Sequence, residues 1–418
     1  MKKQFTRAVK FVIRMVSYRL SWMFEWVMSR HIAERRKEVI LSSPGNHVFF
    51  GYYDVSPFAA DGKRVLAGRV DLALKTPAPH RVMEVGYYQL DNPEEFRGIG
   101  QTTAWCWQQG CRLQWYPAIG VTRQVFYNHA SGSDYVGVVQ DVETGQIVMT
   151  TPLPLYEISK DGKWGLSLDF ARLQRLRPGY GYSVFEDGTS AQPVPQQGGI
   201  MLYDFASNQQ SLVVSYSALF EFSPVESMQG AEHYINHLSF NPSGAAFIFL
   251  HLWVRDGKRY SRLLWVDRGS AKLVILNNSG RVSHYTWRDD QTLLIYCALT
   301  ADGPLFYHEY LLHGDQFEVK AVGKNVLKVD GHPSYFNAQH RFLTDTYPDR
   351  WARQTLMIYD GAVNAVVWSR SFFRSKHITG EFRADLHPRL DSTQKYACID
   401  DEIRGERVMR IVIFGESV

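Results

Sequence analysis

Short stretches of alternating apolar and polar residues, each interrupted by a polar turn, recur seven times along the chain. Alternation with a period of two is typical of half-buried strands, and the turns carry the Gly, Asp, Asn and Gln residues that tight hairpins favour. Each unit therefore predicts a strand, a turn and a second strand. The seven units begin at Ser56, Gln114, Tyr156, Leu238, Tyr285, Pro333 and Pro388.

A second series of alternating segments follows in the same order, one after each hairpin. These segments begin at Tyr87, Gly137, Met201, Leu263, Tyr307, Leu356 and Arg410. A hairpin and a further pair of strands make a four-stranded blade, and a repeat of about 50 residues suits a propeller with some long loops. We predict an all-β chain with a seven-bladed β-propeller over residues 45–418. The alternative is a different all-β fold with unrelated hairpins.

The first 40 residues follow another pattern, in which polar residues recur every three or four positions over residues 3–28. This spacing predicts an amphipathic helix, whose other face carries large apolar residues such as Trp22 and Phe24. Arg14, Arg19 and Glu25 interrupt the apolar run, so neither a signal peptide nor a membrane span is expected. We expect the basic helix to lie on the inner leaflet of a membrane, or alternatively against the propeller or a partner protein.

Composition narrows the location and the partners. Aromatic residues make up 14% of the chain, which favours β-structure. The formal charge is +4, but residues 1–40 hold ten Lys or Arg and three Asp or Glu, so the body carries no basic excess for nucleic acid. The four cysteines form neither a disulfide framework nor a zinc pattern. A cytoplasmic protein, peripheral at the inner membrane, is the expectation.

Histidines occupy one repeat position in the last four units. The position seven residues before the last residue of each polar turn holds, in order along the chain, Val55, Leu113, Leu155, His237, His284, His332 and His387. Equivalent positions of a propeller lie at one level around its axis, so the four imidazoles are expected to converge. Imidazole is the commonest transition-metal ligand, and these histidines are therefore the predicted metal site. The alternative is a set of structural histidines that bond neighbouring strands.

Carboxylates and a further histidine lie close to these positions in the sequence. Asp330 and Asp385 each stand two residues before a histidine, and residues i and i−2 of a strand share a face. We expect them, with His233, to support the metal ligands from behind. Asp54 precedes Val55 and is a candidate member of the site.

Several of these segments resemble a known family. INHLSF, VSHYTW, DGHPSY and DLHPR are similar to repeats of the oligogalacturonate lyases, which are propellers with a histidine-rich Mn²⁺ site. WCWQQGCRLQW, RPGYGY and TDTYPD also resemble propeller proteins of bacterial surface-polysaccharide clusters. The lyase site includes a Gln, whereas all four positions here are His. The resemblance implies a manganese-dependent lyase that acts on an acidic polysaccharide.

The implied reaction is β-elimination on a uronic acid. Neutralising the carboxylate acidifies the C5 proton, a base removes it and the 4-oxygen leaves. The candidate carboxylate clamps or bases are Arg172 and Arg389, and the candidate proton donors are Tyr180 and Tyr53. Two other readings stay open: a glycosyltransferase or other glycan-modifying enzyme, and a glycan-binding scaffold. No serine-hydrolase, P-loop or dinucleotide motif stands in its required context.

Overall fold

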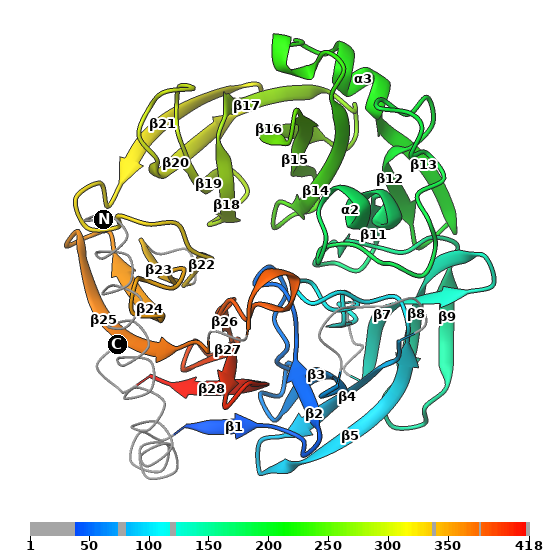
Figure 1. Ribbon diagram of the computed structural model, residues 1–418, viewed down its shortest axis with the longest axis vertical. Helices are drawn as coiled ribbons and strands as arrows, with labels where there is room; N and C mark the ends of the chain where they lie inside the picture. The colour runs from blue at the N-terminus through cyan, green and yellow to red at the C-terminus, as the bar shows by residue number, and fades with distance from the viewer. Residues whose placement is uncertain (1–37, 74–80, 118–122, 337–339, 376–377, 415–418) are drawn as a thin grey trace, which may run out of the picture.

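The computed structural model describes residues 38–73, 81–117, 123–336, 340–375 and 378–414. Seven four-stranded antiparallel sheets stand around a common axis, as Figure 1 shows. The prediction of a seven-bladed all-β propeller is thereby confirmed. The amphipathic helix expected over residues 3–28 lies outside the described residues. Within the described part of the chain, no helix has the length and apolar character of a membrane span.

Each blade runs outward from an inner strand to an outer one. Blade one holds β2 (Asn46–Phe49), β3 (Arg64–Asp71), β4 (Met83–Gln89) and β5 (Asn92–Thr102). Blade two holds β6 (Gln114–Trp115), β7 (Gln124–Ser131), β8 (Asp134–Asp141) and β9 (Ile147–Thr151). Blade three holds β10 (Glu157–Ile158), β11 (Trp164–Ser167), β12 (Gly199–Asp204) and β13 (Gln209–Ser215). Blade four holds β14 (Glu232–Phe240), β15 (Ala246–Arg255), β16 (Lys258–Asp267) and β17 (Leu273–Gly280).

The last three blades repeat this arrangement. Blade five holds β18 (Val282–Trp287), β19 (Thr292–Cys297), β20 (Phe306–His313) and β21 (Gln316–Val322). Blade six holds β22 (Ser334–Tyr335), β23 (Arg341–Thr344), β24 (Arg353–Asp360) and β25 (Ala365–Phe373). Blade seven holds β26 (Arg389–Leu390), β27 (Tyr396–Ile403), β28 (Glu406–Ile413) and β1 (Val39–Leu41). The described helices are α2 (Phe170–Leu176), α3 (Tyr216–Glu221), η1 (Glu226–Met228) and η2 (Gly380–Phe382).

The ring closes by a strand from the start of the chain. β1 pairs antiparallel with β28, with Val39 opposite Ile411, and so supplies the outer strand of blade seven. The propeller therefore begins before residue 45. Glu38 strengthens this junction, because its buried carboxylate pairs with Arg410 of blade seven and Arg370 of blade six.

The inner hairpins and the apolar core follow the predicted alternation. Gly162 ends the turn of blade three with a φ of 71°, a left-handed conformation that glycine adopts without steric cost. The largest apolar cluster runs through blades three to five, and a second cluster joins blades one, two and seven. Packing between neighbouring blades thus holds the inner strands at fixed positions around the axis.

Two departures from regular blades shape the centre of the ring. In blade one, residues 50–57 leave the sheet between β2 and the bridge that joins Phe58 to Val65. In blade three, α2 and the loop that follows it form a long insertion between β11 and β12. Asp169 begins α2 by accepting a hydrogen bond from the Arg172 amide at 2.9 Å. Figure 1 shows α2 over the inner part of blade three, beside β14.

Candidate functional site

Tyr52, from the blade-one loop, lies in the middle of the four aligned histidines. The Tyr52 ring lies 4.7 Å from the His237 ring, stacked on it, and 4.9 Å from the His387 ring. His332 lies 4.2 Å from His284 and 4.4 Å from His387, as measured between ring centroids. The histidines of four blades therefore meet around Tyr52, a residue that the repeat pattern did not single out.

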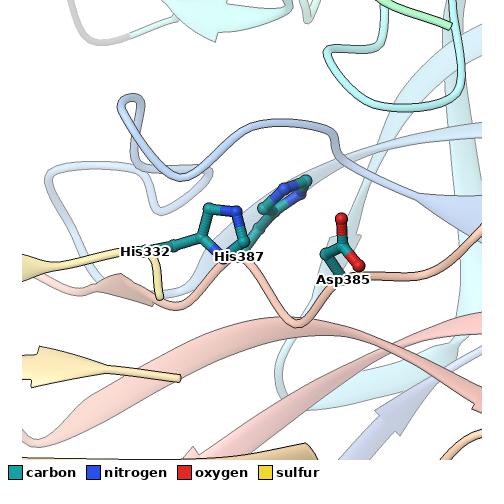
Figure 2. A group of neighbouring side chains, drawn as sticks. All are labelled: His332, Asp385 and His387. Carbon is teal, nitrogen blue, oxygen red and sulfur yellow. The ribbon is translucent and has the colours of Figure 1, made fainter. Parts of the chain in front are cut away.

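His332, Asp385 and His387 form the one group in the described ranges whose histidine, cysteine and carboxylate atoms are placed to share a metal ion. One ligand atom from each lies within 4.8 Å of the others, and all three side chains are buried. In Figure 2 the two histidine rings and the carboxylate converge from the loops that precede β22 and β26. Nε2 of His387 is buried without a hydrogen-bond partner, whereas Oδ1 of Asp385 forms an ion pair with the Arg374 guanidinium at 3.6 Å. A buried nitrogen without a partner is costly in a folded protein unless a ligand occupies it, so His387 together with His332 and Asp385 fits a divalent cation.

In His387, His332 and His284, the ring nitrogen Nδ1 donates a hydrogen bond to an oxygen atom. Nδ1 of His387 donates to the Gly51 carbonyl at 2.7 Å, and Nδ1 of His332 donates to Asp345 at 2.9 Å. Nδ1 of His284 donates to Asp330 at 3.1 Å. An acceptor on Nδ1 fixes the tautomer that leaves the Nε2 lone pair for a metal or a proton, as in known metal sites.

The surroundings give these histidines different proton affinities. Burial lowers the pKa of His387 well below its usual range, and the nearby His332 and Arg389 lower it further. Burial also opposes protonation of His332, but Asp345, Asp385 and Asp330 outweigh it and raise its pKa. His387 is therefore a neutral ligand at physiological pH.

His237 is engaged differently from the other three. Its ring nitrogens are hydrogen-bonded to the hydroxyls of Tyr52 and Tyr156, at 3.1 and 3.2 Å. Burial, followed by the charge of His284, lowers the pKa of His237 well below its usual range. His237 and His387 both have a positive φ, 54° and 44°, which is rare outside glycine and is concentrated at functional sites.

A cavity of about 510 Å³ opens beside the histidines, between blades four and five. His237, His284 and Asp330 line its inner end, and His332 lies directly behind His284. Its charged and aromatic lining consists of Arg177, Arg259, Arg281, Tyr180, Tyr234, Tyr260, Tyr296 and Tyr347. Arginines pair with carboxylates and tyrosine rings pack on sugar rings, so the lining suits an anionic carbohydrate.

Tyr180 and Tyr347 bring the predicted motifs RPGYGY and TDTYPD to this cavity. The Tyr180 hydroxyl accepts a hydrogen bond from Arg383 at 2.6 Å, and Arg383 also donates to Asp385 at 2.6 Å. The Tyr347 ring lies 5.7 Å from His332 and is 37% exposed, at the mouth of the site. Tyr180 therefore keeps its own hydroxyl hydrogen available for a ligand.

Several of the other candidate residues have structural partners instead. The fully buried Arg172 guanidinium donates to the carbonyls of His233, Thr189, Gln192 and Pro193, so it holds the insertion and is not placed to clamp a substrate. His233 bonds His251 at 2.8 Å, in a buried chain away from the aligned histidines.

The remaining three candidates support the site from behind. Tyr53 donates its hydroxyl to the carbonyl of Tyr285 at 2.8 Å, so this hydrogen is already used. Arg389 donates to Gly51 and Asp400, below His387. Asp54 forms a two-pronged ion pair with Arg112 at 2.9 and 3.1 Å. Each of these side chains fixes backbone or another side chain, and none of them lines the cavity.

Some residues of the site had no signal in the repeat pattern. Tyr52, Asp345 and Arg281 come from loops or loop ends, where no period marks a position. Asp345 follows the second strand of the blade-six hairpin, opposite His332, and only knowledge of the strand pairing would have indicated it.

Comparison with known proteins places the fold. No family model matches the chain, and no curated protein matches it. A structure of oligogalacturonate lyase in complex with manganese superposes with a TM-score of 0.62 at 12% identity, over 91% of this chain and 93% of its own. Oligogalacturonate lyase from Vibrio parahaemolyticus gives 0.60 at 12% identity, over 91% and 94%. The chain has the oligogalacturonate lyase fold.

The resemblance predicted from the histidine-bearing repeats is thus confirmed for the architecture. At 12% identity, the oligogalacturonate lyase fold establishes the arrangement of the blades and not the reaction.

Proposed function

We propose that this propeller is a metal-dependent lyase that cleaves a uronic-acid-containing bacterial surface polysaccharide by β-elimination. The observation that carries the proposal is the cavity with three arginines, which ends on His284 in front of the buried cluster of His332, Asp385 and His387. β-Elimination on a uronate uses a cation, a carboxylate clamp and a base at one place, and these residues supply all three.

His332, Asp385 and His387 would hold the divalent cation, with manganese as the first candidate because a solved structure with this fold contains it. A bound cation supplies the positive charge that neutralises a uronate carboxylate and so acidifies the neighbouring C5 proton. A divalent cation held by two imidazoles and one carboxylate would still have coordination positions for a uronate carboxylate.

The remaining steps fall to residues of the cavity. Arg177, whose guanidinium lies 4.8 Å from the centre of the Tyr180 ring, is placed to bind a further carboxylate of the polysaccharide. Arg281 also lines the cavity, but it already donates to the Gly303 carbonyl at 2.9 Å. His284, whose Nδ1 is held by Asp330, is the proposed base for the C5 proton. Tyr180 is the proposed donor to the departing 4-oxygen, because Arg383 hydrogen-bonds its oxygen and leaves its hydrogen free.

The test is incubation of the purified protein and Mn²⁺ with a panel of polyuronates. Elimination creates a conjugated double bond, so ultraviolet absorbance should rise with wild type and not with His284→Gln. The matched control is His308→Gln, because His308 is buried in blade five away from the cavity. Absence of unsaturated product from every polyuronate would refute the lyase.

A transferase of polysaccharide assembly is the second candidate, favoured by the basic and aromatic residues 3–28, which we propose attach the protein to the inner membrane. Release of nucleotide from a sugar nucleotide would select the transferase. Binding of glycan without turnover or metal would select a scaffold. Flotation with anionic vesicles, lost on deletion of residues 1–37, tests the attachment.

A further inference from the structure

The peptide at Gly51 connects blade one to the histidine cluster. Its carbonyl accepts hydrogen bonds from Nδ1 of His387 at 2.7 Å and from Arg389 at 3.1 Å. Because His387 offers Nε2 to the cluster, the position of this one carbonyl sets both its tautomer and its ring orientation.

Asp400 holds the two peptides that immediately precede this carbonyl. This fully buried carboxylate on β27 accepts from the amides of Phe50 and Gly51 at 3.1 and 3.2 Å. It also accepts from Arg389 at 3.0 Å and Arg407 at 3.4 Å. Four donors use the whole acceptor capacity of a carboxylate, so the backbone of Phe50 and Gly51, from which the carbonyl projects, has little freedom to move.

The packing on the other side is equally tight. Gly51 has a φ of 136°, and a Cβ there would stand 2.7 Å from the Gln109 carbonyl carbon. A Cβ on Gly110 would stand 2.5 Å from the Phe50 carbonyl oxygen. The loop of residues 50–57 is therefore clamped between Asp400 of blade seven and the backbone before blade two, at the junction where β1 closes the ring.

We propose that Asp400 is a positioning residue for His387, and that metal binding depends on it through the Gly51 carbonyl. This inference rests on the proposed metal centre. Asp400 does not touch the cluster itself. It acts through two amides, one carbonyl and the Nδ1 hydrogen of His387.

The experiment compares Mn²⁺ binding by the full-length wild type, Asp400→Asn and Asp401→Asn, measured from the free Mn²⁺ signal in electron paramagnetic resonance. Asp401 is the matched control, since it is the next residue on β27, is buried and pairs with Arg410 on the opposite face. Loss of such an outer partner typically weakens metal binding about 10- to 100-fold. We expect that loss for Asp400→Asn and wild-type affinity for Asp401→Asn.

Pulsed measurements on the bound Mn²⁺ separate positioning from a general effect of charge. The nitrogen couplings report the histidine ligands, and Asp400→Asn should lose the coupling of one imidazole. Equal affinity and unchanged couplings in Asp400→Asn, or equal losses in both variants, would overturn the inference. If wild type itself binds no Mn²⁺, the proposed metal centre fails, and this inference falls with it. Should Asp400→Asn not fold, Arg389→Gln removes the second donor to Gly51 and is expected to change the same couplings.

Discussion

Replacing Asp54 by Asn tests whether this residue supports the fold or takes part in the reaction. Its carboxylate pairs with Arg112, whose side chain is 1% exposed, while Asp54 is 15% exposed. The same guanidinium donates to the Tyr156 carbonyl at 2.6 Å and lies 4.2 Å from the Tyr156 ring centre. Tyr156 in turn bonds His237, so the ion pair supports the wall of the site.

The size of the effect follows from the charge that Asp54→Asn leaves behind. Removing one partner of a buried ion pair costs about 3 to 5 kcal/mol, because the other charge stays in the interior. Asp54 retains contact with water and Asn keeps one acceptor, so the lower end applies. We expect the free energy of unfolding to fall by about 3 kcal/mol.

The assay is urea unfolding followed by tryptophan fluorescence at neutral pH. Asp330→Asn is the control, because Asp330 is similarly exposed at 17% and its partners, Ser283 and His284, carry no obligatory charge. We expect Asp330→Asn to lower the free energy of unfolding by about 1 kcal/mol. If Asp54→Asn costs no more than the control and instead abolishes turnover, Asp54 is a reacting group and the structural assignment is wrong.

Three further outcomes are expected. His332→Ala combined with His387→Ala should remove bound Mn²⁺, and metal retained by elemental analysis would contradict the cluster. Arg177→Met should raise KM for an oligouronate about tenfold or more with little change in kcat, since a hydrogen bond to a charged group contributes about 1.5 to 3 kcal/mol; an unchanged KM would place the substrate elsewhere. Burial and the charge of Asp54 raise the pKa of Glu157 to about 8, so the folded state binds the extra proton and stability falls as pH rises from about 4.5 to about 8. Glu157→Gln should remove that fall, up to about 5 kcal/mol, in urea unfolding at the two ends of this range, and identical pH profiles would disprove it.

Much of the architecture could be predicted because a propeller repeats. The hairpins that begin at Ser56 and Leu238 have similar patterns of apolar and polar residues, since each blade packs between two other blades. The same reasoning located His237, His284, His332 and His387, which the structure brings together. The start of the propeller was harder to see, because β1 is only three residues long and pairs with the far end of the chain.

The roles of single side chains at the site could not be predicted in this way. Arg172 and Tyr180 lie in one insertion, and both are residue types that could act on a substrate. In the structure Arg172 donates to backbone carbonyls, whereas Tyr180 lines the cavity. The difference depends on which loop packs against which blade. Such contacts carry no period, so a pattern search does not detect them.

The order of apolar and polar residues was sufficient to specify seven blades and one histidine level, because local alternation and turn chemistry act over a few residues. The packing of segments that are far apart in the sequence determines which atoms meet at that level. Tyr52 reaches the four histidines because residues 50–57 leave the sheet of blade one. The Gly51 carbonyl orients His387 because Asp400, far along the chain, holds the amides of Phe50 and Gly51. Burial then leaves Nε2 of His387 without a partner beside His332 and Asp385, and these three residues of the aligned level form the candidate metal centre.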